Sequence, residues 1–296
     1  MDQGSPHKDG MACWICGSTR SRLVKASSPD LTLQASDLAI TDSNYGRTGE
    51  IRQCLDCTFL QVSEISNPLS LYEDLEDPSY DEGRGYRSLQ CQKLLEVIRK
   101  YKSRGRLLDI GAGTGIMLEE AAKLGFVGCG VEPSQWLSQK ASERGLQVFQ
   151  GTYPHKDITG AFDVVTLVNV LEHVTDPVGL LRAMSKAMAD DGIGFVVTPD
   201  VSSFARKLLR WRWWHFRVAH IGYFDKRPLT LALDKAGLQL VAFGRPGWYF
   251  SASYLVDRLN QYLPTWIHLP SFAALRRLII PLNLKDSLYV IFRRKA

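Results

Sequence analysis

The chain has 296 residues, enough for one large α/β domain and a small additional module. Its hydrophobic content of 45% and charged content of 23% are ordinary for a globular protein, and a formal net charge of +5 does not by itself indicate nucleic-acid binding. No stretch approaches the roughly 18 apolar residues that span a bilayer. Residues 1–10 form a polar, flexible tail without the apolar core of a signal peptide, so we expect a cytoplasmic protein.

Four of the six cysteines form two C-x-x-C pairs within residues 11–62, namely Cys13 with Cys16 and Cys54 with Cys57. Four thiolates are the tetrahedral ligand set that structural Zn²⁺ prefers, and they leave no open position for chemistry. The loop between the pairs is longer than the usual ribbon spacing, so two unrelated cysteine pairs remain an alternative. The pattern therefore predicts a zinc-ribbon-like module with an architectural metal.

Residues 63–87 are rich in acidic and aromatic side chains, among them Tyr72 and Tyr80, and are predicted to form a linker that lies over a cleft. Strands and helices then alternate through residues 88–296, which is the signature of a parallel sheet. The predicted helices are 88–101, 115–124, 134–144, 177–189, 203–214 and 228–236. The predicted strands are 106–110, 127–131, 146–150, 162–169, 193–198, 238–244 and 287–292, with an insertion at 251–283.

The strand at 106–110 leads into a glycine-rich turn that opens a helix, and its residues are Asp109, Gly111, Ala112, Gly113, Thr114 and Gly115. This arrangement brings backbone N–H groups and a helix N-terminus close to a ligand. A Cβ at Gly111 or Gly113 would block the turn or the approach of the ligand. Glu132, at the end of the next strand, is placed to bind ribose hydroxyls, and Pro133 and Ser134 shape the turn beside it. Together these features predict a nucleotide-type cofactor.

The glycine spacing distinguishes between cofactors. The dinucleotide fingerprint is G-x-G-x-x-G, whereas this turn reads G-x-G-x-G with Ile116 in the place of the third dinucleotide glycine. Asp109 can meet an ammonium group, which S-adenosylmethionine (SAM) carries and NAD lacks. The segment resembles motif I of the class I SAM-dependent methyltransferases. The resemblance covers about residues 88–296 and implies a Rossmann-like, doubly wound, seven-stranded sheet with an antiparallel last strand.

Two further segments extend the resemblance. Asn169, Val170 and the Leu171-Glu172-His173 block follow Phe162-Asp163-Val164-Val165. This pattern resembles the F-D-x-V…L-E-H block of small-molecule methyltransferases such as the ubiquinone-biosynthesis type, also described as methyltransferase type 23. It implies that Asn169 and Val170 contact the cofactor. His173 would lie where donor and acceptor meet, either as a general base or as a residue that orients a loop.

The loop after the third strand departs from the family pattern. An acidic residue usually meets the adenine amine there, but this chain has Gly151 and Thr152. Adenine recognition would then depend on Thr152, on backbone groups or on Tyr153. The chain also lacks the [N/D]-P-P-Y motif of nucleic-acid amino methyltransferases, which argues against base amino groups as the acceptor.

The run from His220 to Phe224 resembles the H-x-x-Y-F signature of zinc-ribbon methyltransferases that act on sugars and other cell-surface metabolites. The resemblance implies that His220 and Tyr223 enter the acceptor pocket together with Tyr80, although ordinary packing is the alternative for each. It favours a small-molecule acceptor, such as a sugar, a sugar nucleotide or a lipid-linked intermediate. An RNA methyltransferase that uses the zinc module, or a non-catalytic SAM-binding partner protein, remains an alternative.

The segment 203–217 is dense in tryptophan and arginine, and the insertion is rich in apolar residues around Arg276 and Arg277. Three interpretations compete for these segments. They form a lid over the acceptor cleft, a peripheral membrane contact through 203–217 and 263–283, or a nucleic-acid surface. We expect nucleic acid to be the least favoured of the three.

Overall fold

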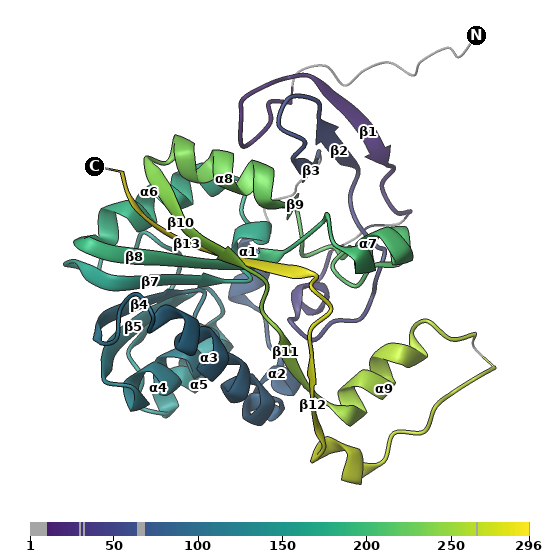
Figure 1. Ribbon diagram of the computed structural model, residues 1–296. Coiled ribbons are helices and arrows are strands. Elements are labelled where there is room, and N and C mark those ends of the chain that lie inside the picture. The colour runs from purple at the N-terminus through teal and green to yellow at the C-terminus, as the bar shows by residue number, and fades with distance from the viewer. Residues whose placement is uncertain (1–10, 30, 32, 64–68, 265, 296) are drawn as a thin grey trace.

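The computed structural model describes residues 11–29, 31, 33–63, 69–264 and 266–295, so the predicted tail at 1–10 lies outside the described residues. Its main feature is a seven-stranded sheet in the order β10-β13-β8-β7-β4-β5-β6 (Figure 1). The strands are β4 (Gly105–Ile110), β5 (Phe126–Glu132), β6 (Val148–Gln150), β7 (Phe162–Val168), β8 (Met188–Pro199), β10 (Leu238–Gly244) and β13 (Ser287–Arg294).

The sheet confirms the predicted topology. Strands β4 to β8 pair in parallel, whereas β13 pairs antiparallel with both β8 and β10. The chain proceeds outward from β4 to β5 and β6, and then returns to place β7 on the other side of β4. Strand order therefore reverses between β4 and β7, and ligands bind open α/β sheets at such a switch point.

Helices cover both faces of the sheet (Figure 1). One layer consists of α3 (Arg84–Ile98), α4 (Ile116–Lys123) and α5 (Gln135–Glu143), and the other of α6 (Pro177–Ala187) and α8 (Lys226–Lys235). Leu94, Leu95 and Ile98 of α3 are buried in the first layer, as their helical spacing predicts. The hydroxyl oxygen of Ser134 accepts the amide N–H of Leu137 and caps α5.

Several element boundaries differ from the prediction. Helix α6 ends at Ala187 instead of 189, and Gly192 lies inside β8, where the pairing with β7 shifts register. Gly192 therefore accompanies an irregularity in the strand. The predicted helix 203–214 divides into α7 (Phe204–Leu209) and a 3-10 turn, η3 (Arg210–Arg212), because Arg210 has a φ of +50° that cannot continue an α-helix.

The N-terminal module shares a sheet with the main domain. Its strands are β1 (Ser21–Lys25), β2 (Ile51–Cys54) and β3 (Leu60–Val62). The 3-10 turn η1 (Ala35–Leu38) lies between β1 and β2 in the sequence. A fourth strand, β9 (Gly222–Tyr223), comes from the main domain and pairs antiparallel with β3. Trp213 and Phe216 are fully buried in the apolar cluster between the two parts. These aromatic residues of the predicted lid are therefore core residues.

The predicted linker is partly helical. It contains α1 (Leu69–Glu73) and α2 (Pro78–Glu82), and α3 begins at Arg84 inside it. The predicted insertion at 251–283 contains α9 (Ala252–Asn260), the 3-10 turn η4 (Ala273–Arg276) and β12 (Ile279–Leu282), and β11 (Trp248–Ser251) comes directly before it. We call residues 248–282 the arm, because β11 and β12 form a two-stranded ribbon that carries α9 away from the sheet (Figure 1). Among the helices that the structure describes, none is long and apolar enough to cross a membrane.

Candidate functional site

A cavity of about 990 Å³ lies where β4, β5 and β7 reach their carboxyl ends. Its wall brings together most of the predicted site residues, which are Tyr80, Asp109, Gly111, Ala112, Gly113, Glu132, Pro133, Thr152, Asn169, Val170, His173 and His220. In the described part of the chain, the wall does not include Thr114, Gly115, Ser134 or Tyr223. The predicted cofactor end and the predicted acceptor end therefore belong to one cavity.

The glycine turn has the backbone geometry that its sequence predicts. Gly111 has a φ of +76° and Gly113 a φ of +54°, both in the left-handed region that favours glycine. A Cβ on Gly111 would lie 2.4 Å from Cγ2 of Val170, and a Cβ on Gly113 would lie 3.1 Å from the hydroxyl oxygen of Tyr80. Side chains at these two positions would therefore crowd residues that line the cavity.

Two buried carboxyl groups flank the glycine turn. Glu132 accepts the backbone N–H groups of Gly113 at 2.9 Å and of Ser134 at 3.0 Å. Asp109 accepts the hydroxyl of Thr166 at 2.6 Å. Burial raises the pKa of each carboxyl to about 7, because the charged form loses its solvent. A cationic ligand beside them would favour the charged forms, so these groups suit a positively charged guest.

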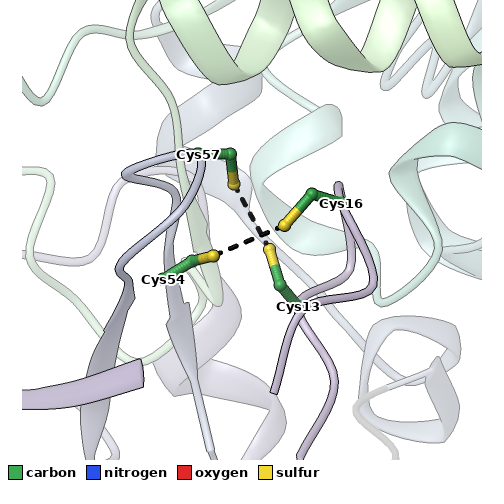
Figure 2. A group of neighbouring side chains, drawn as sticks. All are labelled: Cys13, Cys16, Cys54 and Cys57. Carbon is green, nitrogen blue, oxygen red and sulfur yellow. Dashed lines mark hydrogen bonds between the residues drawn. The ribbon is translucent and has the colours of Figure 1, made fainter. Parts of the chain in front are cut away.

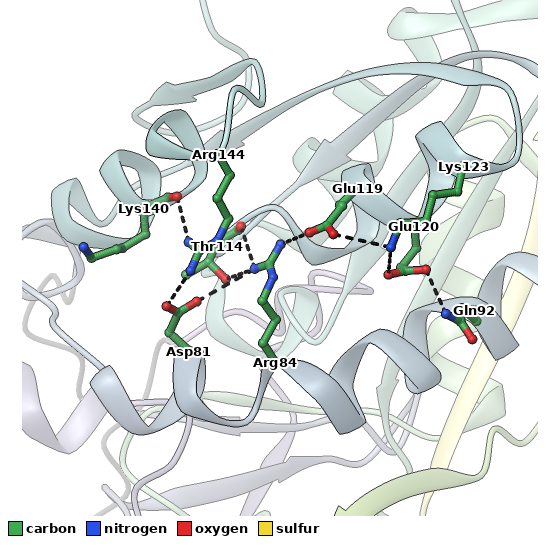
Figure 3. A network of polar contacts seen from close by, with 9 residues as sticks. All are labelled: Asp81, Arg84, Gln92, Thr114, Glu119, Glu120, Lys123, Lys140 and Arg144. Atoms are coloured by element: carbon green, nitrogen blue, oxygen red, sulfur yellow. Dashed lines mark hydrogen bonds and ion pairs between the residues drawn. The ribbon is translucent and has the colours of Figure 1, made fainter.

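Thr114 and Ser134 connect the glycine turn to the helices above it. The Arg84 guanidinium donates to the hydroxyl oxygen of Thr114 at 3.1 Å and also pairs with Glu119 (Figure 3). The hydroxyl of Ser134 donates to the carbonyl oxygen of Leu75 at 2.6 Å. Both residues were predicted to contact the cofactor. In the structure, Thr114 instead contacts α3, and Ser134 contacts the segment between α1 and α2.

Two polar residues of α3 that no motif predicted also line the cavity. Arg87 and Gln90 line the cavity three residues apart on one helical face. The Arg87 guanidinium lies 4.2 Å from the centre of the Tyr80 ring. Its Nε and both amide atoms of Gln90 are buried and have no hydrogen-bond partner among the described residues. Unsatisfied buried donors are costly, so they indicate a polar ligand group at this wall. No motif marks them; the helical spacing was the one available signal.

Three side chains converge at the end of the cavity that is predicted to take the acceptor, where the 3-10 turn η2 (Leu171–His173) follows β7. Glu172, His173 and His220 each present a ligand atom, and these atoms lie within 4.8 Å of one another. The hydroxyl of Thr198 donates to Oε2 of Glu172 at 2.9 Å. Oε1 of Glu172 and Nδ1 of His220 are buried without a partner in the described part of the chain. The cluster can therefore accept a ligand proton or hold a cation.

The hydrogen bonds of His173 define its tautomer. Its Nδ1 lies 2.7 Å from the carbonyl oxygen of Ala219 and 2.6 Å from the hydroxyl oxygen of Tyr72. A carbonyl oxygen only accepts, so Nδ1 carries the hydrogen and Nε2 keeps its lone pair. His173 thus joins α1 to the segment before β9, and Tyr72 is a second residue that the sequence analysis did not assign to the site.

Burial controls the charge of this cluster. It lowers the pKa of His173 to about 3, assisted by the positive charge of Arg217, and it lowers the pKa of His220 well below its ordinary value. Burial raises the pKa of Glu172 to about 7. Both imidazoles are therefore neutral at pH 7, and Glu172 is the group that changes protonation near that pH. This pattern favours an orienting role for His173 over strong basicity.

Tyr223 contacts the backbone of His220. Its hydroxyl donates to the carbonyl oxygen of His220 at 2.8 Å, and its backbone pairs with Leu60 in β3. The imidazole of His215 stacks on that of His220 with 5.6 Å between ring centres. Tyr223 was predicted to enter the acceptor pocket, but its hydroxyl is committed to this backbone contact.

The four cysteines of the N-terminal module converge (Figure 2). Sγ of Cys13 lies 3.5 Å from Sγ of Cys57, and Sγ of Cys16 lies 3.4 Å from Sγ of Cys54. A tetrahedral site with Zn–S bonds of about 2.3 Å needs sulfurs about 3.8 Å apart, so the four side chains fit a zinc ion. The contact between Cys13 and Cys57 lowers the pKa of Cys13 and raises the pKa of Cys57, so Cys13 is the thiol of this pair that ionises first.

Comparisons with known proteins agree with this geometry. A family model described as "Methyltransferase domain" matches residues 83–242, more than half of the chain. A ubiquinone biosynthesis O-methyltransferase of Caulobacter sp. (strain K31) is 37% identical over 101 residues, which are 31% of this chain and 40% of that protein. The corresponding protein of Psychrobacter cryohalolentis is 34% identical over 146 residues, 46% of this chain and 53% of its own length. The chain thus spans about half or less of these relatives.

One solved structure shares the fold over a larger part of the chain. It comes from the complex between the Haloferax volcanii Trm112 methyltransferase activator and a methyltransferase. The similarity has a TM-score of 0.53 at 12% sequence identity and covers 79% of this chain and 100% of the other. At this identity the comparison shows a common fold and nothing about substrates.

Proposed function

The chain belongs to the methyltransferase domain family, and on that premise we propose that it transfers a methyl group from SAM to a small metabolite. The observation that carries the proposal is one continuous cavity, which has the glycine turn at one end and Glu172, His173 and His220 at the other. A volume of about 990 Å³ is at the upper end of the range for small-molecule sites. It gives room for a nucleoside and an acceptor together.

The cofactor end fits SAM by charge and by hydrogen bonding. SAM supplies a methyl group on a sulfonium that is already activated for in-line displacement. Asp109 and Glu132 offer carboxylates to its ammonium group and ribose hydroxyls, and both line the cavity. Arg87, with its unpartnered Nε, is placed to meet the carboxylate of the methionine part. Thr152 and Tyr153 line the region that we assign to adenine.

The acceptor end suits a hydroxyl nucleophile. The chain's task in this reaction is to hold donor and acceptor in line and to exclude water. Oε1 of Glu172, 3.9 Å from Nε2 of His173, is a buried oxygen free to take a proton. Its pKa of about 7 matches neutral pH, so Oε1 can take the proton of an acceptor hydroxyl directly, and the two neutral imidazoles lie beside that oxygen. The relatives named O-methyltransferases support oxygen as the methylated atom.

The proposed acceptor is a sugar, a sugar nucleotide or a lipid-linked intermediate. Aromatic and aliphatic side chains from the arm and the loop after η1 form part of the cavity wall, among them Trp248, Tyr249 and Ile40. Such surfaces pack against the faces of sugar rings and against apolar groups. The zinc ion that we propose for the four cysteines is structural, because its module holds β9 and the nearby His220 in place.

The test uses radiolabelled SAM and a fractionated cell extract. We expect label to enter a sugar, nucleotide or lipid fraction, whereas label in RNA would contradict the proposal. His220→Ala should abolish transfer while binding of S-adenosylhomocysteine (SAH), measured by calorimetry, stays within about threefold. Well-folded protein that binds neither SAM nor SAH would refute the cofactor assignment.

Tyr72→Phe distinguishes the two roles of His173. The substitution removes the hydroxyl oxygen that accepts from Nδ1 and leaves the imidazole in place. If His173 mainly orients the loop, Tyr72→Phe and His173→Ala should lower turnover by similar factors and leave the pH profile unchanged. A loss confined to His173→Ala, with a shifted pH profile, would instead indicate that the imidazole acts as the base.

A further inference from the structure

The arm and α7 expose apolar side chains that the rest of the molecule does not cover. The indole of Trp266 is 81% exposed and the ring of Phe204 is 75% exposed. Five more exposed side chains belong to the same two segments, namely Leu208, Leu259, Leu269, Phe272 and Leu278. Large apolar side chains that gather on a surface mark an interaction site more often than a free surface.

These two segments are neighbours in space, although about fifty residues separate them in sequence. The hydroxyl of Tyr262 donates to the carbonyl oxygen of Arg212 at 2.8 Å. The guanidinium of Arg212 donates to the carbonyl oxygen of Gln261 at 3.4 Å and lies 5.3 Å from the centre of the Tyr262 ring. Gln261 and Tyr262, which directly follow α9, therefore contact η3, which directly follows α7.

The same segments carry mostly positive charge, since Asp257 of α9 is the one acidic residue in residues 248–285. Residues 201–224 contain five Lys and Arg and no acidic residue, and residues 258–285 contain four Lys and Arg and no acidic residue. Six of these cations are exposed, namely Lys207, Arg210, Arg212, Arg276, Arg277 and Lys285. Exposed cations interleaved with exposed apolar side chains complement an anionic surface that also has an apolar interior.

We propose that α7 and the arm bind the surface of an anionic lipid bilayer. Trp266 and Phe272 enter the boundary between headgroups and acyl chains, where aromatic rings are favoured, and Arg276 and Arg277 meet lipid phosphates. The contact is peripheral, since the described helices include none that could span a bilayer. The proposal goes beyond methyl transfer, because binding to lipid requires no turnover.

The arm also connects this surface to the cavity. Trp248, Tyr249 and Phe250 of β11 line the cavity, and the next residue leads into α9. An enzyme held at the bilayer by the arm would therefore have one wall of its acceptor cavity continuous with the lipid contact. Among the proposed acceptors, this arrangement fits a lipid-linked one best.

Two of the three tryptophans in residues 211–217 cannot take part in the proposed lipid contact. Trp213 is fully buried, and the indole N–H of Trp214 donates to Asp286 at 2.8 Å. These side chains cannot reach headgroups without unfolding the core between the two parts of the molecule. The lipid contact of the 203–217 region is therefore restricted to its exposed residues in α7 and η3.

The test is flotation of the full chain with vesicles of phosphatidylcholine alone or with added phosphatidylglycerol. We expect binding to the anionic vesicles at low salt and its loss at about 1 M salt, where the Debye length is about 3 Å. Arg276→Gln with Arg277→Gln should weaken partitioning about 25-fold, at about fivefold for each charge. The matched control, Lys100→Gln with Arg104→Gln, removes the same charge from the exposed segment before β4. It should change partitioning to the vesicles less than twofold.

Apolar contacts have their own variants. Trp266→Ser with Phe272→Ser should reduce flotation at least tenfold, whereas Val127→Ser, at an equally exposed position on β5, should not. Each variant should bind SAH like the unchanged protein, which separates a lost surface from a misfolded chain and from failure of the methyltransferase proposal. The lipid proposal is overturned if anionic vesicles fail to float the protein. It is equally overturned if the Trp266 and Phe272 changes spare flotation but dissociate a homo-oligomer in sedimentation.

Discussion

Replacing Gly111 with alanine tests the central geometry of the cofactor end. The new Cβ would lie 2.4 Å from Cγ2 of Val170, whereas ordinary contact begins near 3.4 Å, so the loop or Val170 must move by about 1 Å. The left-handed φ of +76° adds roughly 1–2 kcal/mol of strain for a residue with a side chain. Overpacking adds about 1–3 kcal/mol. The free energy of unfolding should therefore fall by about 2–5 kcal/mol.

The matched control is Gly145→Ala, which has nearly the same φ, +75°, and nothing within 4 Å of the new Cβ. It should lose only the roughly 1–2 kcal/mol of backbone strain. Urea denaturation measures both losses, and calorimetry measures the affinity for SAH. We expect Gly111→Ala to weaken SAH binding at least about tenfold, which corresponds to 1.4 kcal/mol, and Gly145→Ala to leave it unchanged. Equal SAH affinity in the two variants would refute the placement of the cofactor against this turn.

Three further outcomes are expected. Asp109 and Glu132 have pKa values near 7, and a cation favours their charged forms, so affinity for SAM should rise between pH 6 and pH 8. A flat pH profile in calorimetry would contradict the role of these carboxyls in binding SAM. Arg84→Ala should weaken SAH binding about three- to tenfold by releasing α3 from the glycine turn, while Lys93→Ala, which removes an exposed ion pair of α3, should not. Cys54→Ser should lower bound zinc and abolish methyl transfer while SAH still binds, and elemental analysis that finds unchanged zinc would remove the proposed site.

Several features followed from local sequence. The left-handed glycines of the 111–115 turn, the caps at Ser134 and Asp176, and the alternation of strands with helices depend on contacts within a few residues. The turn at the first C-x-x-C pair belongs to this group as well, because it ends at a left-handed glycine, Gly17, whereas the left-handed φ of Thr58 after the second pair has no signal in its residue type. Short-range constraints of this kind are readable from residue type and spacing.

Other features required the whole structure. Tyr72 meets His173 across 101 positions of sequence, and β9 completes a sheet begun at β1. Arg87 and Gln90 belong to the cavity only because α3 packs over the carboxyl ends of the strands. Trp213 is buried and Trp266 is exposed, although both are tryptophans in basic segments.

The physical reason is the range of the interactions. A turn or a cap depends on the backbone of a few consecutive residues, so the amino-acid pattern predicted the glycine turn, the order of elements and the two cysteine pairs. Burial, the pKa values of Glu172 and His173, and the continuity between the arm and the cavity depend on which distant segments exclude water from one another. That exclusion arises only when the sheet, the module and the arm have packed together.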